Sequence, residues 1–163
     1  LLRAIEMMGG KIEILSIKNE DTEAIADLRI KSQNLHGATF GGDIIPAMID
    51  EIPALAALAC FAEGETIIKD AEELKVKESN RIKVMVEELS KMGAQIEETE
   101  DGMVIHGKHP LHPAQIDSHK DHRIAMTFSI LSRAIGKDLP IIDKDCVKIS
   151  YPNFYEHLHS LSS

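Results

Sequence analysis

Charged side chains gather at three points along the chain where a helix is expected to begin. Each point places a carboxylate within a few residues of a cation or of a helix-starting proline; the residues are Asp50, then Lys77, Glu78 and Arg81, then Asp121, His122 and Arg123. Carboxylates transfer protons, and Arg and Lys hold phosphate or carboxylate groups through charge-assisted hydrogen bonds. The residue types therefore suit acid-base chemistry on a bound anion.

The second point opens a well-patterned helix. Apolar residues recur at steps of three and four from Ile82 to Met92, Ser79 or Asn80 could cap the start, and Gly93 suits the end. Cations at a helix start oppose the helix dipole, which favours negative charge there. A bound anion would explain them, and a solvated, ion-paired helix start remains the structural alternative.

The charged residues at the other two helix starts can likewise be explained by a bound anion or by a structural role. Asp121 could cap a helix whose first turn holds Arg123, which needs a partner or a ligand on entering an apolar segment. Asp50, ahead of Pro53, taken alone is more simply an N-cap. If the three helix starts point the same way, they converge on one cleft with two carboxylates for proton transfer and three cations for an anion.

An internal repeat supports such a convergence. "LLRAIEMMGGKIEIL" at the start resembles "MVEELSKMGAQIEET" from Met85, and the segments that follow Asp50 and Asp121 share a second pattern of apolar helix, Gly turn and Ile-rich strand. Helices are predicted at 53–63, 79–92, 122–135 and 153–161, and strand-like stretches at 24–32, 35–45, 103–112 and 114–118. We expect an α+β domain of about two repeat units, with helices 53–63 and 122–135 buried on every side among sheets.

Composition restricts the partners. A formal charge of −9 argues against nucleic acid and anionic membrane, and the apolar run 52–62 is too short to span a bilayer. Only Cys60 and Cys146 are present, which predicts no disulfide and a reducing, cytoplasmic setting. Pro110 and Pro113 interrupt the three histidines of 106–112, so these histidines are predicted to lie in a turn rather than to bind a metal. Residues 1–163 are expected to form one domain.

From about Asp50 to its end, the chain resembles the C-terminal portion of the 5-enolpyruvylshikimate-3-phosphate synthase family. The matching stretches are "DEIPALAALACFAEGET", "EELKVKESNRIKVMVEELSKMGA", "DGMVIHG", "DHRIAM" and "SYPNFYEHL". The resemblance implies two similar domains built of βαβαββ units, whose inward helices start at the interdomain cleft. This chain would then form most of the C-terminal domain of a longer protein, without the N-terminal domain.

The resemblance also implies a reaction and residue roles. The enolpyruvyl group of phosphoenolpyruvate passes to the 5-hydroxyl of shikimate 3-phosphate, and phosphate is released, with no metal or organic cofactor. Asp50 matches a proton acceptor that contacts the shikimate hydroxyls, Lys77 a shikimate 3-phosphate contact, and Glu78 the acid at the methylene carbon. Arg81 and Arg123 match the arginines that hold phosphoenolpyruvate, with Asp121 and His122 beside them.

The match is incomplete at three places. Asn80 stands where many members have Asp, and Lys75 where many have Arg. Lys148 lies one step before Ile149, where some members have the Lys that contacts phosphoenolpyruvate. Two other functions stay open: the related UDP-N-acetylglucosamine enolpyruvyl transferase, and a non-catalytic module that binds anions. In either enolpyruvyl transferase, this chain would supply one wall of the site and be inactive alone.

Overall fold

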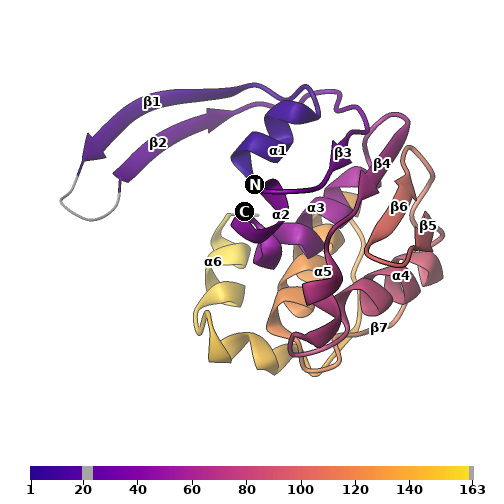
Figure 1. The fold of residues 1–163 in the computed structure, drawn as a ribbon. Coiled ribbons are helices and arrows are strands. Elements are labelled where there is room, and N and C mark those ends of the chain that lie inside the picture. The colour runs from indigo at the N-terminus through magenta and orange to yellow at the C-terminus, as the bar shows by residue number, and fades with distance from the viewer. Residues whose placement is uncertain (20–23, 162–163) are drawn as a thin grey trace.

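A computed structural model describes residues 1–19 and 24–161 (Figure 1). In chain order, the first elements are α1 (Leu2–Met7), β1 (Ile12–Asn19), β2 (Ala24–Ile30), β3 (Thr39–Phe40), α2 (Ile44–Ala47), the 3-10 helix η1 (Ile49–Glu51), α3 (Ile52–Ala59) and β4 (Glu65–Ile68). The later ones are η2 (Glu72–Val76), α4 (Arg81–Lys91), β5 (Gln95–Glu98), β6 (Met103–His106), β7 (Ile116–Asp117), α5 (His122–Ile135), β8 (Ile141–Ile142), η3 (Lys144–Ile149) and α6 (Phe154–Ser160). Among the described residues, no helix is long and apolar enough to cross a membrane.

The central part of the chain, residues 39–106, is one complete βαβαββ unit. Its sheet has the order β3-β4-β6-β5, with β3 parallel to β4 and the other neighbours antiparallel. Ile68, Met103 and Ile105 are fully buried on this sheet. Because side chains alternate along a strand, these residues give the sheet an apolar face against the helices.

Partial units flank the complete one. The order α1-β1-β2 repeats α4-β5-β6, and β7-α5-β8 repeats the opening strand, helix and strand, with β7 parallel to β8. The expected α+β architecture of repeated units is confirmed, as one complete unit between two partial ones.

Helices α3, α4 and α5 meet in the middle of the core. Leu55, Ile82, Met85, Ile124 and Phe128 show no exposed surface. Burial of an aliphatic or aromatic side chain of this size contributes about 1.5–3 kcal/mol to folding. This packing fixes the first turns of the three helices relative to one another.

Four sequence predictions need correction. The strand predicted at 103–112 ends at His106, because Lys108, at φ 64°, turns the chain and Pro110 has no amide hydrogen to donate. The stretch 35–45 is strand only at 39–40, because Gly42, at φ 63°, turns the chain into α2. Helix α3 ends at Ala59 rather than near 63, since Cys60 is its C-cap and the next residues form a turn before Gly64, at φ 89°. Helix α5 is not buried on every side: Ile130 and the residues of its last turn lie on the surface.

Helix α5 has the predicted bounds, whereas α4 begins two residues later and ends one residue earlier than predicted, and α6 is one residue shorter at each end. Asn80 is the N-cap of α4, where its side-chain oxygen accepts a hydrogen bond from the Lys83 amide at 3.1 Å. Gly93 follows α4 with φ 91°, and Gly136 follows α5 with φ 63°. A left-handed residue of this kind is readily supplied by glycine, which has no Cβ.

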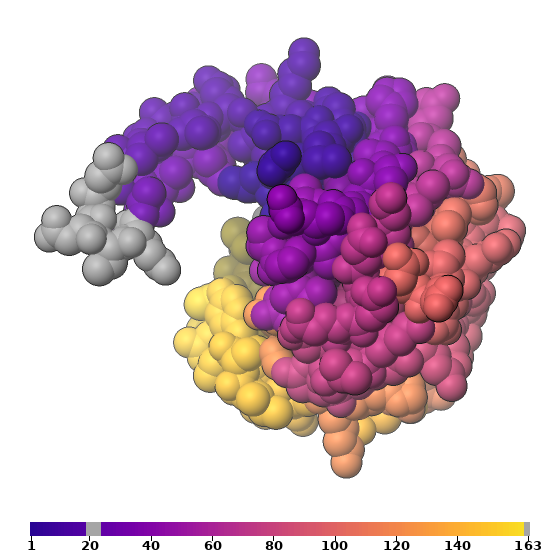
Figure 2. Space-filling view, in the orientation of Figure 1, coloured from indigo at the N-terminus to yellow at the C-terminus, as the bar shows by residue number. Residues whose placement is uncertain are grey.

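The hairpin of β1 and β2 extends away from the rest of the molecule (Figures 1 and 2). Its strands pair antiparallel with each other, and the described part of the chain provides no third strand for this sheet. The hairpin therefore differs from its counterpart β5-β6, which lies inside a four-stranded sheet.

Candidate functional site

The three charged helix starts come together in one cluster, as the sequence predicted. Arg81 is the first residue of α4, Asp121 is the N-cap of α5, and Asp50 lies in η1 just before α3. Hydrogen bonds join all three, although they are up to 71 positions apart in the chain (121 minus 50). The packing of α3, α4 and α5 thus gathers these side chains at one place.

The guanidinium of Arg81 is the centre of the cluster. Its Nε donates to Asp121 Oδ2 at 2.8 Å, its Nη1 to Asp50 Oδ1 at 2.9 Å and its Nη2 to Glu78 Oε2 at 2.7 Å. The side chain is 1% exposed. Three carboxylates from three parts of the chain therefore hold one buried cation, with bonds in the range of charge-assisted hydrogen bonds.

Asp121 is completely buried behind Arg81. Its Oδ1 accepts the Arg123 amide hydrogen at 2.9 Å, which caps α5, and its Oδ2 also accepts from Ser79 Oγ at 2.9 Å. Burial by itself would raise the pKa of Asp121, but the hydrogen bond and charge of Arg81 outweigh it and hold the pKa below its ordinary value. Asp121 is therefore an anion at neutral pH.

Asp50 lies between the two arginines of the cluster. Its Oδ1 takes Arg81, and its Oδ2 accepts from Arg123 Nη2 at 3.3 Å. Burial opposes its charge, but the hydrogen bond from Arg81 and the charges of Arg123, Arg81 and Lys77 lower its pKa. The interpretation of Asp50 as an N-cap is wrong: Glu51 is the residue before α3, and no side chain caps that helix.

The outer part of the cluster is open to solvent. The side chains of Glu78 and Asp50 are 49% and 43% exposed, and that of Arg123 is 33% exposed. Arg123 also lies 3.8 Å from Glu51 Oε1. The site thus has two layers, with Arg81 and Asp121 inside and with Arg123 and three exposed carboxylates, Asp50, Glu51 and Glu78, outside.

The other predicted site residues are Lys77, His122 and Lys148, and they differ in their contacts. Lys77 pairs with Glu73, yet its charge still reaches Asp50. His122 is the first residue of α5, and no described residue forms a hydrogen bond or ion pair with its ring. Lys148 is exposed in η3 and pairs with Asp145 at 2.8 Å.

Two members of the cluster were missed at the sequence level, Ser79 and Glu51. The sequence predicts Ser79 only as a possible cap of α4, whereas in the structure its Oγ donates to Asp121 Oδ2. Glu51 follows Asp50 directly. Both residues lie close in sequence to a predicted site residue. Sequence proximity alone does not show which neighbouring side chains point toward the cluster.

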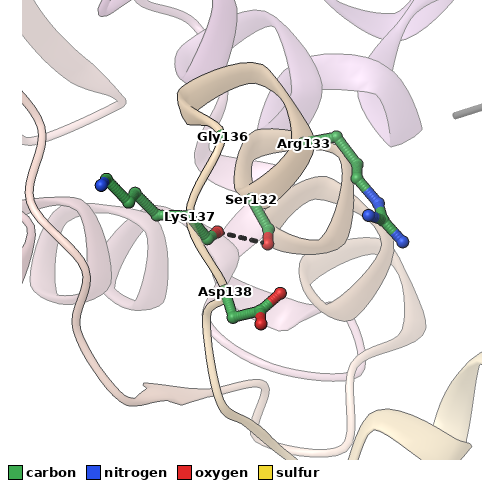
Figure 3. A pocket seen from close by; sticks show the side chains of 5 residues that line it. All are labelled: Ser132, Arg133, Gly136, Lys137 and Asp138. Atoms are coloured by element: carbon green, nitrogen blue, oxygen red, sulfur yellow. Dashed lines mark hydrogen bonds between the residues drawn. The ribbon is translucent and has the colours of Figure 1, made fainter.

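Pockets elsewhere lack this convergence. One lies at the C-terminal end of α5 and is lined by Ser132, Arg133, Gly136, Lys137 and Asp138 (Figure 3). Ser132 Oγ donates to the Lys137 carbonyl at 2.7 Å, and the charged ends of Arg133 and Lys137 point in opposite directions. A 14-residue helix is about 21 Å long, so the pocket is remote from Asp121. Gly136 is the C-cap of α5; its amide donates to the Arg133 carbonyl, and the Lys137 amide donates to the Ser132 carbonyl.

Among the described residues, no group of three His, Cys, Asp or Glu side chains is placed to hold a metal ion. His106 lies in β6 rather than in the predicted turn, and its Nδ1 is 3.7 Å from Glu65 Oε2 on the neighbouring strand β4. Cys60 and Cys146 are both free thiols.

The fold resembles that of known enolpyruvyl transferases. A solved EPSP synthase from Acinetobacter baumannii superposes with a TM-score of 0.90 at 37% identity, covering 98% of this chain and 38% of that one. The enolpyruvyl transferase NikO from Streptomyces tendae is 20% identical with a TM-score of 0.69, and shares the fold. The chain therefore has the enolpyruvyl transferase fold.

The particular family follows from sequence. The model of EPSP synthase, 3-phosphoshikimate 1-carboxyvinyltransferase, matches residues 1–158, and the chain belongs to this family. Proteins named 3-phosphoshikimate 1-carboxyvinyltransferase are 48% identical in Bacillus licheniformis and 50% identical in Geobacillus thermodenitrificans, over 163 residues each. The chain spans 38% of the length of either relative. These matches do not favour the UDP-N-acetylglucosamine enzyme or a non-catalytic module.

Proposed function

We propose that this chain forms one wall of an active site that transfers the enolpyruvyl group of phosphoenolpyruvate to the 5-hydroxyl of shikimate 3-phosphate, in the shikimate pathway to aromatic amino acids. The family supports the reaction. The observation that carries the placement is the guanidinium of Arg81, which is bound at once by Asp50, Glu78 and Asp121.

The proposed reaction needs a proton donor at the methylene carbon of phosphoenolpyruvate and a proton acceptor at the 5-hydroxyl of shikimate 3-phosphate. The methylene carbon of phosphoenolpyruvate gains a proton, the neighbouring carbon becomes cationic, and the 5-hydroxyl oxygen bonds to it and loses its own proton. The bond to phosphate then breaks, and the new methyl group returns a proton. Exposed carboxylates at Glu78 and Asp50 suit these transfers, with Glu78 at the methylene carbon and Asp50 at the hydroxyl.

The lowered pKa of Asp50 fits the role of acceptor. The carboxyl is ionised at neutral pH because Arg81 and Arg123 outweigh the effect of its burial, so it is ready to take a proton from the hydroxyl. Lys77, whose charge reaches Asp50, is proposed to contact the 3-phosphate of the same substrate.

Arg81 and Arg123 are proposed to hold phosphoenolpyruvate. Both already face carboxylates, so the anion must replace some of these partners or be helped by cations from elsewhere. Two arginines face the four carboxylates Asp50, Glu51, Glu78 and Asp121, so this wall is negative overall. We infer that the missing N-terminal domain supplies further Lys or Arg, and that this chain alone binds the anion poorly.

Asp121 and Ser79 are proposed to act through Arg81. Asp121 has no exposed surface, so it holds the Arg81 guanidinium in place rather than touching phosphoenolpyruvate. His122 at the start of α5 and Lys148 in η3 are also proposed to contact phosphoenolpyruvate.

Phosphate release tests this proposal. The 163-residue chain and a complete protein that contains it are each supplied with phosphoenolpyruvate and shikimate 3-phosphate. We expect release from the complete protein and none above background from the chain alone, because half of the cleft is absent. Robust turnover by the chain alone would contradict a shared site.

A further inference from the structure

A strained turn lies directly before the buried Asp121. The Asp121 amide donates to the Ser118 carbonyl at 2.9 Å, and the two residues between them, His119 and Lys120, have φ of 50° and 60°. Two central residues with positive φ are the pattern of a type I′ turn, which strongly favours Asn-Gly or Asp-Gly. Here both central residues carry a Cβ, so the local sequence preference opposes the turn. Contacts from outside the turn must therefore hold it.

Three hydrogen bonds fix the backbone that enters the turn. Glu88 Oε2 of α4 accepts the Asp117 amide hydrogen at 3.2 Å, and Asp117 Oδ1 accepts the His119 amide hydrogen at 2.8 Å. Ser118, which has no exposed surface, donates from Oγ to the Ile142 carbonyl of β8 at 2.8 Å. Helix α4 and strand β8 thus both bind this segment.

The carboxylate of Glu88 is buried, with a side chain that is 1% exposed. Its Oε1 accepts from Lys91 Nζ at 2.6 Å, and its other oxygen takes the Asp117 amide. A buried carboxylate is costly unless its oxygens have partners, so both contacts matter to it. The preceding residue Glu87 is instead on the surface, where it pairs with Lys83. The chain therefore keeps a charged acceptor in its interior where α4 meets the strand that leads to the turn.

Helix α4 binds the segment 117–121 at both of its ends. Glu88 binds the first amide of the segment, and Arg81, about two turns earlier in the same helix, binds the Asp121 side chain at 2.8 Å. The strained turn lies between these two contacts. Asp121 Oδ1 also accepts the Arg123 amide hydrogen at 2.9 Å. The shape of the turn therefore decides where the first turn of α5, which carries Arg123, lies relative to Arg81.

We propose that Glu88 is a positioning residue, which holds the turn of His119 and Lys120 in its left-handed form and thereby places Arg123 to bind phosphoenolpyruvate. The proposal rests on the proposed function, in which two arginines hold that substrate. Because Glu88 is buried in the interior, it acts through the turn and not by touching the substrate. Its loss should therefore weaken the binding of phosphoenolpyruvate and spare that of shikimate 3-phosphate.

Two substitutions of Lys120 separate the strain of the turn from the charge of the side chain. Lys120→Gly and Lys120→Ala both remove the ammonium group, but only glycine adopts a positive φ without steric cost. With glycine, the turn should keep its shape without the contact from Glu88, whereas with alanine it should still depend on that contact. Glu87→Ala is a further control on α4, since Glu87 is exposed.

The test measures the KM for each substrate in the complete protein. Glu88→Ala should raise the KM for phosphoenolpyruvate by about fivefold, the size expected for one lost hydrogen bond, and Glu87→Ala should not. Glu88→Gln should stay close to the unsubstituted protein, because its amide oxygen still accepts from Asp117. Adding Lys120→Gly to Glu88→Ala should remove most of the increase, and adding Lys120→Ala should remove none of it. A merely weakened fold would lower the amount of active protein and would not raise one KM selectively.

Amide exchange gives a readout that does not depend on activity. In Glu88→Ala, exchange in the peptide 117–123 of the complete protein should be about tenfold faster, and Lys120→Gly should restore it. Where Glu88→Ala does not fold, Asp117→Ala takes its place, since it removes the bond to the His119 amide from a half-buried position. The same two results are expected from it.

Equal increases of KM for the two substrates, equal rescue by glycine and alanine, or unchanged exchange would each overturn the proposal. Failure of the proposed function would look different. The unsubstituted protein would then release no phosphate, and the exchange results would decide by themselves whether Glu88 holds the turn.

Discussion

Asp121 Oδ2 accepts a hydrogen bond from Arg81 Nε at 2.8 Å, and the two side chains are 0% and 1% exposed. A buried charge without a partner is costly, because water no longer solvates it. This pair therefore fixes the start of α4 against the start of α5, and it also holds the guanidinium that Asp50 and Glu78 share.

Asp121→Asn should destabilise the chain by about 3 kcal/mol, because it leaves the buried Arg81 with less compensating charge. Urea unfolding followed by circular dichroism measures the change. Asp145→Asn is the matched control, since Asp145 forms an exposed ion pair with Lys148 and its loss should be barely detectable. Equal effects of the two substitutions would mean that the Arg81 pair contributes no more than a surface pair.

Acid should destabilise the fold through the same carboxylates. The pKa values of Asp50 and Asp121 are lower in the folded chain than in the unfolded chain, so the unfolded chain binds more protons in acid. Their contribution is complete above the unfolded value of about 4 and is lost as the pH falls through the lower folded values. The urea midpoint should fall from about pH 5 downward, with a shallower fall in Asp121→Asn. A fall of the same steepness in that variant would remove Asp121 from the explanation.

Substitutions of Asn80 test how much the N-cap of α4 contributes to stability. Asn80→Ala should cost about 1 kcal/mol, because the hydrogen bond to the Lys83 amide is lost, while Asn80→Asp keeps that bond and favours the helix dipole. The free energy of unfolding of the two variants gives the comparison. Similar losses for Ala and Asp would show that negative charge beside Glu78 outweighs the cap.

Much of this architecture could be predicted from sequence because its signals are local. The period of apolar residues after Arg81, the cap at Asn80 and the glycine at 93 together define α4. The meeting of the three helix starts also followed, since a repeat places equivalent helix ends in equivalent positions. What sequence could not supply depends on tertiary contacts: whether Asp50 caps a helix or binds two arginines, and which face of α5 meets solvent.

The β1–β2 hairpin is a second case in which tertiary neighbours could not be predicted from sequence. Its alternation predicted strands at 24–32, and the near-copy of 85–99 predicted one after Gly10. Neither pattern tells whether a third strand lies beside Ile30, because that neighbour is not encoded in the hairpin itself.

The central claim is that Arg123 and its neighbours hold phosphoenolpyruvate, and the KM for this substrate in the complete protein tests it most directly. Arg123→Ala removes a charge-assisted contact worth about 1.5–3 kcal/mol, so KM should rise by about tenfold or more. Lys83→Ala removes an exposed cation of α4 that pairs with Glu87 and is not a proposed ligand contact. This variant should leave KM nearly unchanged. Equal KM values for the two variants would contradict the account and reduce Arg123 to a structural ion pair with Asp50.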